Sequence, residues 1–433
     1  MSNKGMSRRS FLKLAGAAAA ATAIPVGGLN KVLTANAQTA LTVQLRSSFI
    51  PTNNELLTAL LNDYAARNGL ELDLSLLNHQ QMAETLTAAA ASGAGPDVLE
   101  TVDIKPHQFA DVLADVSDIC EEIGEANGGW YPVARDLCVV DGVWRAMPHF
   151  LAAHAMVYRE DLLSEAGYDA FPGTWDEVLT MGTELKSMGF PLGFALGHAG
   201  GDGNNFVYSV LWSFGAAVTD EAGVVNLDTP ETRQACEFMQ QLYNDAMIET
   251  VLAWDDSSNN RAFIAGEISV TNNASSILWV GRRDQVEFVD AISHASYPAG
   301  PAGLVQFLEL NTIEILNFSE SIEEAKGLLS FINSPEVWLP LGPDGFAFIY
   351  PLLQNYENHP AMPWNTDPKL AAFKGLAATG KALGYPGTPS AEASEVAASW
   401  IINDMFANVA SGESIDDAVS EAHNACLAIY GQD

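Results

Sequence analysis

Basic residues are scarce in this chain. Lysine and arginine together number 20 among 433 residues, against 54 aspartates and glutamates, and the formal net charge is −34. Five of the basic residues, and no acid, precede residue 38, so the remainder carries only 15 bases. Such a field repels nucleic acid and anionic lipid headgroups, and we expect neither as a partner. With 48% hydrophobic and only 17% charged residues, the chain is expected to fold around a large core.

Cysteine is also scarce. The four residues are Cys120, Cys138, Cys236 and Cys426, and no C-x-x-C pair occurs, which excludes a zinc ribbon and thioredoxin-type chemistry. Cys120 and Cys138 are 18 residues apart and could form a disulfide in an oxidising compartment. The alternative is four buried thiols that pack as small hydrophobic side chains. Spacing alone leaves both open.

The N-terminus has the pattern of an export signal. Arg8-Arg9 precedes an alanine-rich apolar run over residues 14–26, and Ala35-Asn36-Ala37 follows. The run is too short for a membrane span. A paired arginine, an apolar stretch and an A-x-A site predict a cleavable twin-arginine signal peptide over residues 1–37, cut near Ala37. We therefore expect a periplasmic protein without stable membrane insertion.

Strand and helix patterns alternate after this segment. Residues 41–45, 70–76 and 97–101 read as strands, and residues 54–68 and 80–91 as amphipathic helices between them. Such an order predicts an α/β fold with a mostly parallel sheet. Further strands are expected at 151–157, 190–196 and 268–271, and long helices at 174–188, 229–247, 321–333 and 394–430. The 396 residues after Ala37 suffice for two packed domains.

Several short motifs occur in a fixed order along the chain. They are GAGPDV (93–98), DGVWRAMP (141–148), YREDLLSEAG (158–167), TWDEV (174–178), FIAGEI (263–268), EAKGLL (324–329) and SPE (334–336). Some have plain structural reasons, since Thr174 and Glu177 form a helix capping box. As an ordered set, the motifs resemble those of the extracellular solute-binding proteins of ABC importers, family 1, the sugar-binding branch typified by maltose-binding protein.

The resemblance implies an architecture and a function. It implies the two-lobed periplasmic binding protein fold (type II), in which each lobe is a mostly parallel sheet flanked by helices and the ligand cleft lies between the lobes. Lobe I is expected at 38–148 plus 298–345, and lobe II at 149–297 plus 346–433. The implied function is capture of a carbohydrate (sugar, oligosaccharide or sugar alcohol) by hinge closure and delivery to the transmembrane subunits of an ABC permease. The resemblance implies a monomer that binds without a cofactor or metal.

Binding residues are expected where strands end, because ligands of parallel sheets lie beyond the carboxyl ends of the strands. Sugars need carboxylates and amides for their hydroxyls and aromatic faces for their C–H surfaces. The predicted ligand-binding residues, polar first and aromatic last, are Asn53, Asn54, His79, Glu100, Asp103, His149, Asn205, Asn272, Asn273, Trp279, Tyr297 and Phe346.

Each of these residues also has a structural interpretation. Trp279 could be a core residue, Asn272-Asn273 a turn pair, and His79 and His149 groups that support others.

Other ligands and other functions also remain open. A glycerol-phosphate ligand would need basic groups, for which Arg261, Arg282 and Arg283 are the nearest arginines. An enzyme acting on glycosides would need two opposed carboxylates. A receptor that signals to a sensor would have the same sequence pattern as an importer component.

Overall fold

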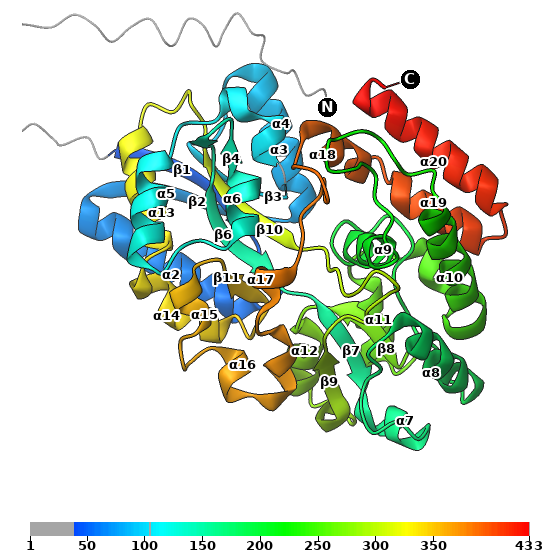
Figure 1. Ribbon diagram of the computed structural model, residues 1–433. Coiled ribbons are helices and arrows are strands. Elements are labelled where there is room, and N and C mark those ends of the chain that lie inside the picture. The colour runs from blue at the N-terminus through cyan, green and yellow to red at the C-terminus, as the bar shows by residue number, and fades with distance from the viewer. Residues whose placement is uncertain (1–38, 104, 433) are drawn as a thin grey trace, which may run out of the picture. The chain divides into compact units, whose positions relative to one another are not determined.

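The computed structural model describes residues 39–103 and 105–432 (Figure 1). The predicted export signal lies outside them. The described chain contains two main sheets, one of six strands and one of three. Within the described residues, no helix combines the length and apolar character needed to cross a membrane.

The six-stranded sheet mixes parallel and antiparallel pairs. Its order is β11-β6-β10-β3-β1-β2, and only β1–β2 and β1–β3 are parallel. The antiparallel pairs involve β6, β10 and β11, which differs from the predicted mostly parallel sheet. These strands are not joined by the β-helix-β crossovers that the first three form, and only such crossovers impose parallel pairing. The strands are β1 (Thr39–Arg46), β2 (Leu70–Leu77), β3 (Val98–Val102), β6 (Met147–Ala152), β10 (Glu309–Ile315) and β11 (Ile349–Pro351).

Helices cover this sheet where the sequence pattern predicts them. The helix after β1 ends at Gly69, whose φ of 67° requires the left-handed region that glycine adopts without strain. The next helix begins with a capping box formed by Asn78 and Gln81. The main helices that contact its strands are α2 (Pro51–Asn68), α3 (His79–Ser92), α13 (Ile322–Ile332) and α14 (Pro335–Asp344) (Figure 1). Shorter elements occupy residues 105–144 and 354–379. They are α4 (Lys105–Gln108), η1 (Ala110–Val112), α5 (Ser117–Ala126), α6 (Pro132–Cys138), β4 (Val139–Val140), β5 (Val143–Trp144), α15 (Gln354–Glu357), α16 (Pro363–Thr366), η4 (Pro368–Phe373) and α17 (Leu376–Thr379).

The second sheet is antiparallel throughout, with the order β8-β7-β9. The expected strand at 151–157 is in fact two strands, because Ala153 and His154 separate β6 of the large sheet from β7 of the small one. The expected strand at 190–196 is absent, and Leu192 makes only isolated bridges there. The predicted capping box of Thr174 and Glu177 is confirmed. The elements here are β7 (Ala155–Arg159), β8 (Val270–Asn273), β9 (Ile292–Ala295), α7 (Glu160–Glu165), α8 (Trp175–Ser187), α9 (Asp202–Ser213), α10 (Pro230–Ala246), η2 (Glu249–Ala253), α11 (Ser258–Ile264), α12 (Ser276–Asp284) and η3 (Val289–Ala291).

The C-terminal helical stretch is broken twice. It forms α18 (Ala391–Ala398), α19 (Ile401–Ala410) and α20 (Ile415–Tyr430) instead of the single helix expected at 394–430. The breaks contain Trp400 with a φ of 60° and Gly412 with a φ of 100°. A residue with positive φ cannot continue a right-handed helix, so each break redirects the chain.

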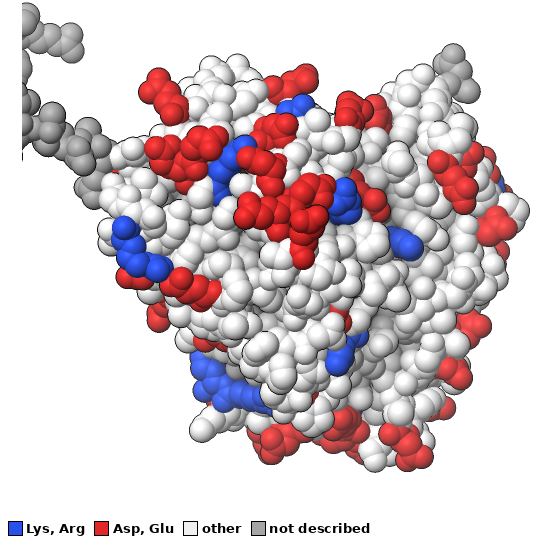
Figure 2. Space-filling model, turned by 60° about the vertical axis from the view of Figure 1, so that its left-hand side comes forward, with Lys and Arg blue, Asp and Glu red and all other residues white. Residues whose placement is uncertain are grey.

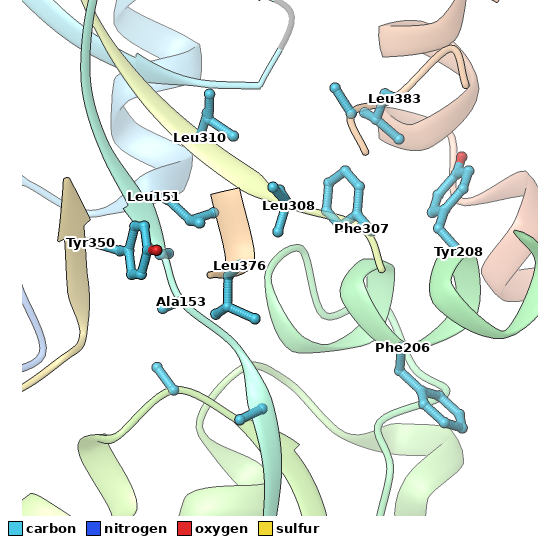
Figure 3. Close-up of a cluster of buried hydrophobic side chains, with 14 of the residues drawn as sticks. Leu151, Ala153, Phe206, Tyr208, Phe307, Leu308, Leu310, Tyr350, Leu376 and Leu383 are labelled. Carbon is cyan, nitrogen blue, oxygen red and sulfur yellow. The ribbon is translucent and has the colours of Figure 1, made fainter. Parts of the chain in front are cut away.

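Three chain segments lie side by side where the chain passes between the sheets. The side-chain amide of Gln306 donates to the carbonyl of His154 at 2.8 Å, and Lys381 N donates to the Gln306 carbonyl at 2.8 Å. Figure 3 shows Phe307 and Leu308 of the middle segment buried there, with Leu376 of α17 on one side and Tyr208 of α9 on the other. The packed crossing gives the two sheets a common core.

The division into two lobes at the expected boundaries stays a prediction. The strand pairing adds detail to it, since β6 remains in the large sheet as far as Ala152, and residues 349–351 pair with β6. The chain therefore leaves the large sheet after residue 152 rather than 148, and the segment after 345 returns to that sheet before it leaves.

The four cysteines are free thiols, and all are buried. The possible Cys120–Cys138 disulfide is therefore not formed, and the alternative of buried thiols is correct. Burial raises the pKa of Cys236 and of Cys426 to about 12, so neither thiol is ionised at neutral pH. On the outside, the face in Figure 2 carries widely spread acidic side chains and few basic ones, as the composition predicts.

Candidate functional site

A cleft of about 790 Å³ opens where the ends of several strands meet the C-terminal helices. Its walls come from the ends of β1, β3 and β8, the start of β10, the loops before α9 and α11, and the junction of α18 and α19. This agrees with the expectation that the site lies beyond strand ends. The lining side chains that carry charge or an aromatic ring are Arg46, Phe49, Asp103, Lys105, His154, His198, Asp202, Asp255, Asp256, Glu309, Phe348 and Trp400.

Arg46 is the buried cation of the cleft wall. Its guanidinium forms an ion pair with Glu309 and donates to Asn311 Oδ1 at 2.8 Å. Its backbone N–H donates to Glu100 Oε2 at 2.7 Å, and His149 Nδ1 lies 2.9 Å from the other oxygen of that carboxylate. Burial disfavours the charge on Arg46, but the neighbouring carboxylates outweigh that effect, and its pKa is raised. Arg46 is thus already neutralised by Glu309.

Asp202 at the start of α9 organises the opposite wall. His154 Nε2 lies 3.0 Å from its Oδ1, and Asn259 and Asn273 donate amide hydrogens to its Oδ2 at 2.9 and 3.2 Å. The Asn272 amide donates to its carbonyl oxygen at 2.8 Å. Burial disfavours protonation of His154, but the Asp202 carboxylate outweighs burial and raises the pKa of the imidazole.

Two further carboxyl groups have high pKa values. Burial, followed by the charge of Glu309, raises the pKa of Asp103 to about 8. Burial, followed by the charges of Asp202 and Glu309, raises the pKa of Asp256 to about 6. The backbone N–H groups of Gly201 and Asp202 both donate to Asp256 Oδ1, at 2.9 and 3.0 Å. At neutral pH, Asp103 therefore holds a proton that it can donate.

Aromatic rings stand at two places on the cleft wall. Phe49 is 53% exposed and meets Phe348 edge to face, with 5.7 Å between the ring centroids. Trp400 stacks on His198, with 4.8 Å between the centroids and 5° between the planes. His198 Nε2 lies 2.8 Å from Asp404 Oδ1. Exposed aromatic faces of this kind suit the apolar C–H surface of a sugar ring.

Of the predicted ligand-binding residues, Asp103 and Asn273 line the cleft. Asp103 follows β3 and Asn273 ends β8, so both were found from strand-end positions. Glu100 and His149 lie beneath Arg46 and hold its backbone, as described above. They support the wall without lining it.

The other predicted residues are engaged elsewhere. Asn205 donates to the Phe307 carbonyl at 2.8 Å and accepts from the Tyr297 hydroxyl, so both fasten the chain crossing. Asn272 binds the Asp202 backbone. The remaining ones are Asn53, which donates to Leu341 O; Asn54, which braces Ser48; Trp279 and Phe346, which lie under Arg283 and Arg282; and His79, whose side chain lies outside the described ones. None of these is among the residues that line the cleft.

Sequence reasoning missed Trp400, Arg46 and the Asp202–His154 pair. Arg46 directly follows the strand predicted at 41–45 and ends the observed β1, so the strand-end rule could have found it. Trp400 had no such signal, because it lies inside a stretch expected to be one continuous helix. Asp202 and His154 are 48 residues apart, and only the folded chain brings them together.

Comparison with known proteins identifies relatives over most of the chain. Residues 51–337 match the family model of bacterial extracellular solute-binding proteins, and residues 5–25 match the signal sequence of the twin-arginine translocation pathway. The second match confirms the predicted export signal, and the two together make this an exported, periplasmic protein.

One curated relative and two solved structures illustrate the likeness. A binding protein of Brucella abortus is 25% identical over 278 residues, which are 62% of this chain and 66% of the relative, just under two thirds. A maltose-bound protein of T. maritima superposes with a TM-score of 0.76 at 24% identity, over 90% of this chain and all of the other. An ABC transporter solute-binding protein of Thermotoga lettingae, bound with α-D-tagatose, superposes with a TM-score of 0.77 at 17% identity, over 90% of this chain and all of the other. These likenesses confirm the two-lobed α/β fold.

Proposed function

Because this chain belongs to the bacterial extracellular solute-binding protein family, we propose that it captures a carbohydrate in the periplasm and delivers it to an ABC permease. The observation that carries the proposal is the cleft itself. Fixed carboxylates and amides line it beside the exposed ring of Phe49 and the half-buried ring of Trp400. Hydroxyls need the first kind of group and sugar-ring faces the second. Structural neighbours bound to maltose and tagatose support the same ligand class.

The proposed capture proceeds by hinge closure. The three hydrogen-bonded segments near His154, Gln306 and Lys381 are the natural hinge, because they are where the chain passes between the sheets. Closure would bring the wall of Asp103 toward the wall of Asp202 and Trp400. Small-angle scattering should then give a smaller radius of gyration with a bound sugar. An unchanged profile at saturating ligand would contradict a hinge.

A phosphate-bearing ligand has less support than a neutral one. Arg46 is neutralised by Glu309. The three arginines considered above for a phosphate ligand are each paired with an aspartate. These pairs are Arg261–Asp255, Arg282–Asp367 and Arg283–Asp284. A phosphate would have to displace the carboxylate partner of one of these arginines. The displaced carboxylate would then lie near the negative charge of the phosphate and repel it.

We further propose that the protein binds without turnover. Two of the cleft carboxylates, Asp202 and Glu309, are held by cations or amides, which makes each a poor catalytic acid, base or nucleophile. Incubation of the purified protein with bound oligosaccharide should leave the sugar intact. Release of reducing ends in proportion to protein would favour a glycoside-acting enzyme instead.

The central test is a thermal-shift screen of the exported form. The panel contains mono-, di- and trisaccharides, sugar alcohols and glycerol phosphodiesters. A ligand at one hundred times its Kd stabilises the native state by ~2.7 kcal/mol, which is readily measured. We expect a shift with a carbohydrate. A shift with phosphodiesters alone would overturn the ligand class, and import by a permease is tested separately by uptake in cells that lack this protein.

A further inference from the structure

The cleft contains more acid than its own cations neutralise. Five carboxylates line it, against the two permanent cations Arg46 and Lys105. Three of the five have partners: Glu309 binds Arg46, Asp202 binds His154, and Asp255 binds Arg261. Among the described residues, Asp103 and Asp256 form no ion pair.

Lys105 compensates for the charge of Asp103 only in part. Its ammonium is hydrogen-bonded to Gln108 Oε1 at 2.9 Å and to Ser394 Oγ at 3.0 Å. Asp103 follows β3 in the left-handed region, with a φ of 59°, and its backbone N–H donates to the Leu310 carbonyl at 2.8 Å. The backbone thus holds this carboxyl group at the cleft wall, while the Lys105 ammonium is hydrogen-bonded to Gln108 and Ser394.

Two carboxylates converge on Gly201. A Cβ atom added there would lie 3.1 Å from Glu309 Oε2 and 3.4 Å from Asp256 Oδ1. Glycine therefore leaves a small space between two acids that any side chain would fill. The Asp256 carboxylate cannot turn away, because two backbone N–H groups bind its Oδ1.

The cleft lining also includes polar side chains with an acceptor atom that lacks a partner among the described residues. Asn204 lines the cleft with a side chain only 7% exposed, and its Oδ1 has no hydrogen-bond partner in the described part of the chain. Asp103 Oδ1 likewise has no partner there, and it becomes an acceptor once the carboxyl group has lost its proton. A buried acceptor without a donor costs ~1–3 kcal/mol, so the ligand is expected to supply donors here. Hydroxyl and ammonium groups both donate, but only an ammonium also supplies positive charge.

We propose that the natural ligand carries a protonated amine, as an amino sugar or amino polyol, held in the part of the cleft lined by Asp103, Asp256 and Gly201. The inference rests on the proposed function and names the chemical class of its carbohydrate. No group of three or more metal-ligating side chains occurs among the described residues, which favours an organic cation over a metal ion.

The protonation of the cleft supports the same ligand. Burial and the charge of Glu309 raise the pKa of Asp103 to about 8, so without ligand this group is mostly protonated at pH 7. Arg46 and Lys105 act in the opposite direction but do not overcome burial. An ammonium bound beside Asp103 would stabilise the carboxylate and release its proton. A neutral sugar would leave the proton in place.

The first experiment compares matched pairs of sugars that differ only in whether they carry amines. The probes are 1-amino-1-deoxy-D-glucitol against D-glucitol, and the glucosamine disaccharide against cellobiose. Calorimetry on the exported form should show at least tenfold tighter binding of one aminated member than of its neutral partner. A neutral member that binds as tightly as its aminated partner, or binds alone, overturns the amine and leaves carbohydrate capture intact. If no member of either kind binds, both proposals fail.

The second experiment measures protons released on binding. Titration of the aminated glucitol at pH 7, in two buffers of different ionisation enthalpy, should show net release in the wild-type protein and little release in Asp103→Asn. Aliphatic amines are already charged at this pH, so they contribute no proton change. Binding of an amine without proton release would contradict the role of Asp103.

Matched variants localise the charge. Asp256→Asn and Gly201→Ala should each reduce the preference for the amine at least fivefold, the first by removing charge and the second by filling the space with a methyl group. Asp290→Asn removes the same charge from an exposed position outside the cleft and should leave the preference unchanged. Melting curves check that each variant folds. If Asp256→Asn and Gly201→Ala are folded and keep the full preference, the assigned position is wrong.

Discussion

The indole of Trp400 lies flat against the imidazole of His198, with 4.8 Å between ring centroids and 5° between planes. Trp400 also has a backbone φ of 60°, which costs a non-glycine residue roughly 1–2 kcal/mol. A strained tryptophan that lines a ligand cleft is best explained by contact with the ligand, because glycine would serve the helix junction better. The stacking of His198 fixes the plane of the indole.

The first prediction separates binding from stability at Trp400. Both Trp400→Ala and Trp400→Gly should lower sugar affinity about tenfold, because a stacked aromatic contributes ~0.5–1.5 kcal/mol beyond its buried area. Trp400→Gly should nevertheless melt at a higher temperature than Trp400→Ala, since glycine accepts positive φ. Calorimetry and thermal unfolding measure the two effects. Trp279→Ala is the control and should keep the sugar affinity of the wild type. A larger loss of affinity in Trp279→Ala than in Trp400→Ala would identify Trp279 as the stacking residue instead.

The second prediction compares the neighbouring Asn204 and Asn205. Asn205 joins Phe307 and Tyr297 in the chain crossing, so Asn205→Ala should destabilise the fold by ~1–3 kcal/mol for the groups left unpaired. Asn204 lines the cleft with an acceptor that has no partner, so Asn204→Ala should weaken sugar binding and leave the unfolding midpoint nearly unchanged. Denaturant unfolding and titration of the same two proteins provide the comparison. The reverse pattern would exchange their roles.

A third prediction follows from the His154–Asp202 pair. Asp202 raises the pKa of His154 above its unfolded value of ~6.5, so the pair stabilises the fold fully below that pH and loses this contribution as pH rises through the folded pKa. The difference in unfolding free energy between wild type and His154→Gln should therefore be largest near pH 6 and shrink toward pH 9. Urea unfolding across this range measures it. A difference independent of pH would mean that folding does not raise the pKa of His154.

The fourth prediction concerns Asp103. Its raised pKa means that the folded state binds a proton that the unfolded state has lost above its own value of ~3.9, so stability falls as pH rises between that value and about 8. Asp103→Asn cannot ionise and should become progressively more stable than wild type over this interval. Thermal unfolding without ligand at pH 4, 6 and 8 tests the trend. A constant offset would show that folding does not raise the pKa of Asp103.

Export gives the last prediction. Replacement of Arg8 and Arg9 by lysine should leave precursor in the cytoplasm, because the twin-arginine pathway reads that pair. Fractionation of cells that express the two forms measures the effect. Normal periplasmic accumulation of the double variant would show that another route carries the protein.

Local patterns predicted much of the fold. The first three strands and two helices were found from periodicity, and the start of α8 was found from the capping box of Thr174 and Glu177. The failures have one physical source. Whether β6 and β7 are one strand or two, and whether β10 pairs parallel or antiparallel, depends on contacts between residues far apart in sequence. The same holds for the candidate site. Asp103 was predicted from its position at a strand end, whereas the contacts of Asp202 depend on residues far away in sequence and were not predicted.

The buried thiols have a practical consequence for following this protein in time. Cys120 and Cys138 lie in α5 and α6, beside the large sheet, whereas Cys236 and Cys426 lie in α10 and α20, which contact each other. Because each sulfur is shielded, a thiol-specific alkylating reagent can modify it only while its surroundings are open. Mass spectrometry of peptides from a labelling time course would therefore give a modification rate for each pair of cysteines. Comparison of the two rates would show whether the two parts of the chain open together or one before the other.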